Sequence, residues 1–110
     1  MEITTSDKFC IITPLSKTLD ERNSARLFQE VSLYNDSLTV GIDLNFVEDC
    51  TIEFIAKLKV VKNINLFNIP SEIFALINFM GLDRCINLFV SELDFKSNHH
   101  RLLKRNFKLV

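Results

Sequence analysis

Residues 64–89 read INLFNIPSEIFALINFMGLDRCINLF, two short apolar runs on either side of a longer segment. The runs at residues 64–67 and 86–89 share one pattern, and short apolar runs bounded by turn residues are typical of buried strands. Between them, residues 70–80 place apolar side chains at helical intervals, and Gly81 supplies a C-terminal cap. This order predicts two neighbouring parallel strands joined by a right-handed crossover. The inward-facing residues of the helix should be Ile73, Leu76, Ile77 and Met80.

Further strands are expected towards the N-terminus. Residues 9–13 form an apolar run that Pro14 ends, because proline has no N–H to continue a ladder. Ile3 begins a short preceding strand. Residues 38–46 read as a buried strand, and Gly41 within it would let another element pack closely.

Three further helices are expected. The first begins at a capping box, Thr18-Leu19-Asp20-Glu21, and runs amphipathically to about Leu33. The second follows Asp49, buries Ile52, Ile55 and Leu58, and ends near Lys59. A capping signal at residues 91–94 opens the last. The side chains expected to be buried most deeply are Phe28, Ile42, Leu44, Leu66, Ile77 and Leu88.

The length of 110 residues and the 47% hydrophobic content fit one packed α/β domain. The net charge of −1 argues against a nucleic-acid binder that works by neutralising phosphates. The charge is nevertheless uneven, since residues 1–95 hold all fourteen acids with eight bases, which gives −6. Residues 96–110 hold five bases and no acid, and we expect them to form a basic helical extension packed on the domain.

The cysteines and the N-terminus indicate a cytoplasmic protein. Cys10, Cys50 and Cys85 show no paired spacing and read as reduced thiols. The chain begins without a signal-peptide pattern, and no uncharged run approaches the ~20 residues that span a bilayer. We therefore expect no membrane insertion.

Catalytic and metal-binding motifs are weak. His99 and His100 lie in the basic extension without a nearby acid, and the sequence contains no nucleophile elbow, P-loop or zinc-protease motif. The cysteines and histidines lack the close pairs typical of zinc sites. We expect neither an enzyme, nor a cofactor, nor a metal.

The best candidate site is the end of the third strand and the loop that follows it. In a parallel sheet, ligands gather where strands end and helices begin. Acidic residues here would repel an anion, so the loop suits a protein partner better than a phosphate. The simpler alternative is that Asp49 only caps the next helix. The candidate residues are Asp43, Asn45, Glu48, Asp49, Cys50 and Thr51.

The sequence resembles a STAS domain in its order of elements and in three stretches. These are the strand end at Asp43-Leu44-Asn45, Asp49-Cys50-Thr51 at a helix start, and the run from residue 64 to 89 with Gly81-Leu82-Asp83. STAS domains are the sulfate-transporter and anti-sigma-factor-antagonist domains. The resemblance covers residues 1–95 and implies a small α/β fold, with a largely parallel mixed sheet of four to five strands and about four helices.

Antagonists of this family are switched off by phosphorylation of a Ser or Thr at the start of the second main helix. The resemblance places the motif Asp on Asp49, the acceptor on Cys50, the second hydroxyl on Thr51 and the Gly on Ile52. Cys50 has no hydroxyl, and Ile52 is not small. Three interpretations stay open: a lost switch, which we favour; a thiol whose pKa the helix lowers; or a switch moved to Thr51.

The resemblance implies a non-enzymatic, partner-switching regulator of transcription. Its partner would be an anti-sigma factor or histidine-kinase-like ATPase, with no nucleic acid bound. The alternative is the cytoplasmic STAS subunit of a bacterial lipid-transport ABC complex, whose partner is the ABC ATPase. A ligand-binding STAS domain is a weaker third choice, because ten Phe and two Gly suggest a filled interior. The sequence leaves the oligomeric state open, a homodimer included.

Overall fold

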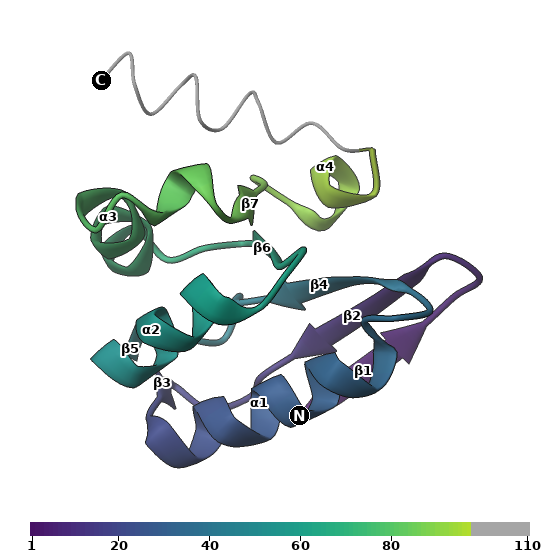
Figure 1. The fold of residues 1–110 in the computed structure, drawn as a ribbon, viewed down its shortest axis with the longest axis horizontal. Helices are drawn as coiled ribbons and strands as arrows, with labels where there is room; N and C mark the ends of the chain where they lie inside the picture. Colours follow the sequence, from purple (N-terminus) through teal and green to yellow (C-terminus); the bar gives the residue numbers. More distant parts are fainter. Residues whose placement is uncertain (98–110) are drawn as a thin grey trace.

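The computed structural model describes residues 1–97, which form an α/β domain around a five-stranded sheet (Figure 1). The sheet order is β1-β2-β4-β6-β7, and all neighbours are parallel except the antiparallel pair β1 and β2. A mostly parallel mixed sheet was expected, and this is confirmed. The strands are β1 (Glu2–Thr5), β2 (Phe9–Thr13), β4 (Thr39–Asp43), β6 (Asn65–Phe67) and β7 (Asn87–Leu88).

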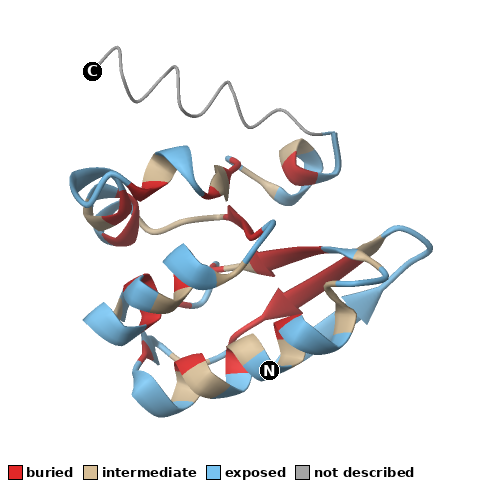
Figure 2. Cartoon of the chain, in the orientation of Figure 1, coloured by how far each residue is buried: buried red, intermediate tan, exposed pale blue. Residues whose placement is uncertain are grey.

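Four helices and a 3-10 turn lie within residues 1–97. They are α1 (Glu21–Tyr34), α2 (Ile52–Val60), α3 (Ser71–Phe79), the turn η1 (Leu82–Arg84) and α4 (Glu92–Ser97). The first three helices bury their apolar sides in one cluster on one face of the sheet, and α4 packs on the other face. Figure 2 shows the buried sides of α1 to α3 turned towards the sheet, with their outer sides exposed.

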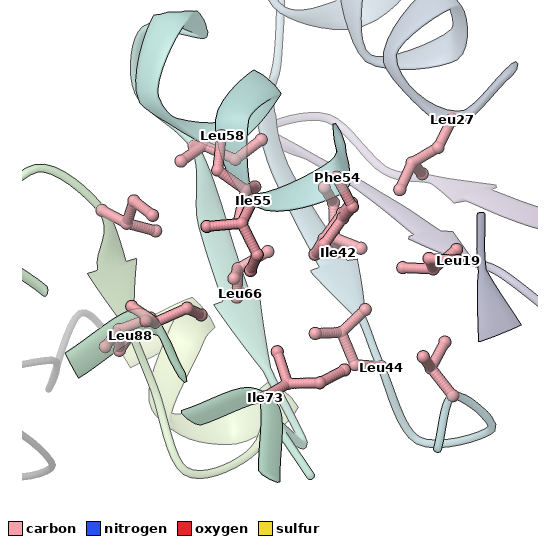
Figure 3. Close-up of a cluster of buried hydrophobic side chains, with 14 of the residues drawn as sticks. Leu19, Leu27, Ile42, Leu44, Phe54, Ile55, Leu58, Leu66, Ile73 and Leu88 are labelled. Atoms are coloured by element: carbon pink, nitrogen blue, oxygen red, sulfur yellow. The ribbon is translucent and has the colours of Figure 1, made fainter. Parts of the chain in front are cut away.

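The main core lies between the sheet and the first three helices. Leu66 and Leu88 project from adjacent strands, and Ile42 and Leu44 continue the layer (Figure 3). Both copies of the INLF run occupy equivalent places, since Asn65 pairs with Asn87 and Leu66 with Leu88. The prediction of neighbouring parallel strands is confirmed.

Gly41 allows the second layer to approach the sheet. A Cβ atom at this position would lie 2.6 Å from Cε2 of Phe95, which projects from α4. That separation is far inside van der Waals contact, so only glycine leaves room for the ring. The ring completes a smaller cluster with Ile11, Phe67 and Phe89. The expected close packing against Gly41 is confirmed.

The capping box predicted at Thr18 is wrong. Thr18 and Leu19 form strand β3 (Thr18–Leu19), which pairs in parallel with β5 (Asp49–Cys50) as a separate two-stranded sheet. Asp20 caps α1 instead, because its Oδ1 accepts a hydrogen bond of 2.8 Å from the backbone N–H of Asn23. The short strand β3 takes up Thr18 and Leu19, and the N-cap lies two residues later than predicted.

Periodicity also misplaced three side chains. Ile52 is 68% exposed, and Phe54 fills the core position in its place. Met80 is the C-cap of α3 and is 44% exposed. Phe74, which was not among the predicted inward-facing residues, is buried on α3. Phe28 is only partly buried at the edge of the core. Helical periodicity shows which side of a helix is apolar. The angle at which the helix packs on the sheet decides which residues of that side become buried.

Several boundaries are confirmed in outline and shortened in detail. The strand expected at residues 38–46 spans Thr39–Asp43, and Gly81 adopts the left-handed conformation with φ of 72° after α3. Ser91 opens α4, accepting from the Asp94 backbone N–H at 3.3 Å. The rest of the basic extension lies outside the described residues. No helix among the described residues is long and apolar enough to cross a membrane.

Candidate functional site

The candidate loop leaves the C-terminal end of β4, where Asp43 and Asn68 together link three strand ends. The Asp43 Oδ1 accepts hydrogen bonds of 3.0 Å from the Asn45 backbone N–H and from Nδ2 of Asn68. Asn68 follows β6 with a φ of 53°, a conformation that asparagine tolerates better than most residues. Its own N–H donates to the carbonyl of Val90 after β7. Hydrogen bonds therefore connect the ends of β4, β6 and β7.

The second half of the loop is held by the segment before α1. The backbone N–H groups of Glu48 and Asp49 both donate to the Lys17 carbonyl, at 2.7 and 3.2 Å. The N–H of Thr51 donates to the Leu19 carbonyl at 3.0 Å. These bonds fix the backbone while the carboxylate side chains stay exposed. The loop is thus a defined surface feature, held from both sides.

Cys50 occupies the position that the family resemblance assigns to the phosphate acceptor. Its side chain is partly buried, and burial together with the neighbouring charge of Asp49 raises the pKa of the thiol to about 11. Desolvation disfavours the thiolate, and a nearby carboxylate disfavours it further. The raised pKa opposes the interpretation of a thiol activated by the helix.

Thr51 is the N-cap of α2, with no hydrogen bond from its side chain to the helix. Its hydroxyl instead donates to the Leu19 carbonyl at 3.3 Å. Asp49 lies two residues before this cap, in β5, so the alternative that Asp49 caps the helix is also wrong. Phosphorylation of Thr51 would have to break the bond to Leu19.

A surface depression of about 450 Å³ separates the loop from the start of α3. Its lining includes the carboxylate residues Glu48, Asp49 and Glu72 beside Val47 and Pro70. Three acids around one depression are unfavourable for an anionic ligand, even though the N-terminus of α3 lies beside it. The expectation of a poor phosphate site therefore agrees with the geometry.

A depression of similar size lies at the opposite edge of the sheet, where the strands begin. Its side-chain amides bond to backbone carbonyls and to each other: Asn65 Nδ2 donates to the Val40 carbonyl at 2.9 Å, and Asn87 Nδ2 donates to Asn65 Oδ1 at 3.1 Å. Such bonds satisfy the buried Asn65 and tie β4, β6 and β7 together. We assign this network to strand pairing.

All six candidate residues lie on one continuous segment, which runs from the end of β4 through β5 to the N-cap of α2. Sequence reasoning missed Asn68, Lys17 and the start of α3, which complete the site. An asparagine between a strand and Pro70 is a turn signal that could have indicated Asn68. Nothing in the sequence indicates the role of Lys17, because only its backbone carbonyl takes part.

Within the described residues, no group of three or more His, Cys, Asp or Glu side chains is arranged to hold a metal ion. His99 and His100 lie outside the described part of the chain. Comparison with known proteins adds no identity, since no family model and no curated protein matches this sequence.

Proposed function

We propose that this chain is a non-enzymatic regulatory protein-binding module of the anti-sigma-factor-antagonist type, working in the cytoplasm. It docks on its partner through the loop from Asp43 to Thr51 and the start of α2. The main support is the exposure of two large apolar side chains: Phe46 on this loop is 52% exposed, and Ile52 at the start of α2 is 68% exposed. Exposed apolar side chains that gather on one surface beside polar groups are typical of protein-binding sites.

The hydrogen bonds around the loop favour docking with little rearrangement. Asp43, Asn68 and the Lys17 carbonyl hold the backbone before a partner arrives. A prearranged surface loses less conformational entropy on binding than a mobile loop does. The partner in this proposal is an anti-sigma factor or a related histidine-kinase-like ATPase.

Site-specific photo-crosslinking tests the docking surface. A photoreactive phenylalanine replaces Phe46 in one variant, Ile52 in a second and Leu33 in a control, and trapped proteins are identified by mass spectrometry. Leu33 is a matched control, because it is 70% exposed on α1. We expect one partner to be trapped at positions 46 and 52 and not at 33. Equal trapping at position 33, or none at the loop, would contradict the proposal.

The identity of the trapped protein separates the two STAS functions. A histidine-kinase-like ATPase supports the antagonist function, whereas an ABC ATPase shows that the chain is the subunit of a lipid-transport complex. Both outcomes retain the docking loop.

The phosphorylation switch is lost in this proposal. Cys50 offers no hydroxyl, and the Thr51 hydroxyl is bonded to the Leu19 carbonyl. Incubation with the partner kinase and ATP should leave the wild-type chain unmodified, and Cys50→Ser should gain phosphate at position 50. Incorporation into wild-type Thr51 would show that the switch has moved.

A further inference from the structure

The carboxylates beside the candidate loop have no cationic partner within the described part of the chain. Glu48, Asp49 and Glu72 are all exposed around the depression between the loop and α3, and Glu53 follows in the first turn of α2. The one ion pair among residues 1–97 lies elsewhere, between Lys96 and Glu92 on α4. The edge therefore carries several uncompensated negative charges.

Two helix N-termini stabilise negative charge at this edge. Glu53 and Glu72 lie in the first turns of α2 and α3, where the helix dipole favours a negative side chain. The backbone of Glu48 and Asp49 is held by the Lys17 carbonyl, which fixes where their charges project from. The acidic edge is thus built on fixed elements.

Apolar side chains flank the same edge. Phe46 lies two residues before Glu48, and Ile52 lies one residue before Glu53. Phe46 and Ile52 are both more than half exposed, and the apolar residues Val47 and Pro70 are among those that line the depression. Exposed apolar and exposed acidic side chains therefore follow one another closely along residues 46–53. A binding segment that matches this edge must carry apolar and basic side chains side by side.

We propose that this edge binds a basic amphipathic helix of the partner protein, whose Lys or Arg side chains reach the depression while its apolar side chains cover Phe46 and Ile52. This inference rests on the proposed docking function and names the chemistry of the partner. Charge complementarity selects this occupant. Nucleic acids and anionic membranes are repelled by the same carboxylates. The remaining occupant, the basic C-terminal part of this chain, becomes an outcome of the test.

The probe is the synthetic peptide LKKLLKLLKKLLKL, labelled with fluorescein and titrated with the full chain in a fluorescence anisotropy assay. A peptide with Glu at every Lys position is the charge control. The site variant is Glu48→Gln with Glu72→Gln, and the matched control is Asp7→Asn with Asp36→Asn. Asp7 and Asp36 are exposed between elements at the opposite edge of the sheet, and replacing them removes the same number of negative charges as the site variant does.

We expect the basic peptide to bind the wild-type chain, and the acidic peptide to bind much more weakly. The site variant should raise the Kd on the order of tenfold, because each surface ion pair contributes a few-fold, while the control variant changes it less than twofold. Ile52→Ser should weaken binding as well. Raising the salt concentration should weaken wild-type binding and leave the site variant less sensitive.

Three results overturn the inference: no binding of the basic peptide, equal weakening by the two acid variants, or insensitivity to Ile52→Ser. A fourth result that would overturn the inference concerns the basic residues of the chain's own C-terminal segment. If Arg101→Gln with Lys104→Gln makes the peptide bind tenfold more tightly, the C-terminal segment of this chain already occupies the edge. Crosslinking at positions 46 and 52 is independent of charge, so its success beside a failed peptide titration would leave the docking function intact and reject only the basic partner.

Discussion

Gly41→Ala tests how the two layers of this domain are joined. The new methyl group would lie 2.6 and 2.7 Å from two ring atoms of Phe95, whereas carbon atoms in good contact are about 3.5–4.0 Å apart. The ring must therefore withdraw by roughly 1 Å. It is only 3% exposed and contacts Phe9, Phe67 and Phe89, with ring centroids 5.4 to 5.6 Å away.

The expected cost is about 1–3 kcal/mol, the usual range for adding a carbon to a filled core. When the Phe95 ring is absent, Gly41→Ala should stabilise the protein instead of destabilising it. In a Phe95→Ala background the methyl group meets open space, and replacing a strand glycine by alanine then stabilises by about 0.5–1 kcal/mol. Phe95→Ala itself should cost about 3–5 kcal/mol.

Urea unfolding of the wild type, the two single variants and the double variant, monitored by far-UV circular dichroism, measures these changes in the free energy of unfolding. Circular dichroism is the better probe, since the chain has no Trp and one Tyr. A cost below ~0.5 kcal/mol for Gly41→Ala would refute the close packing. An equal cost in both backgrounds would show that the strand backbone, and not Phe95, is what resists the methyl group.

Truncating Leu66 or Leu88 to Ala should cost about 2–5 kcal/mol in the same unfolding assay, because each is fully buried, and a change below ~0.5 kcal/mol at both would place them outside the core. The folded protein should lose stability as the pH rises from 9.0, the ordinary pKa of a thiol, to about 11, the raised pKa of Cys50, since the unfolded chain gives up that proton first. Cys50→Ala should reduce this loss, and an unchanged pH profile would contradict the shift. Iodoacetamide at pH 8 should label the exposed Cys85 before Cys50, as peptide mapping can show. Deleting residues 99–110 should lower the melting temperature without loss of solubility, whereas an unchanged melting temperature with lost binding to acidic liposomes would make the extension an anchor.

The candidate loop could be located from sequence because the ends of parallel strands meet at one edge. Once residues 38–46 are read as a strand and a helix follows Asp49, the connection must lie at that edge. The state of Cys50 could not be found in this way. Burial is the larger cause of its raised pKa. That burial follows from packing against the main core and from pairing with Leu19 of β3, a distant part of the chain.

The sequence by itself determines the order of the five main-sheet strands and the four helices, and the parallel pairing of the INLF runs. Hydrophobic periodicity and turn residues act over a few neighbouring positions, so they can be read locally. Only the tertiary structure decides that Thr18 pairs with Asp49 and does not cap a helix, that Phe54 is buried and Ile52 exposed, and that Phe95 covers Gly41. Each of these depends on a partner many residues away, and no local pattern specifies where two distant segments meet.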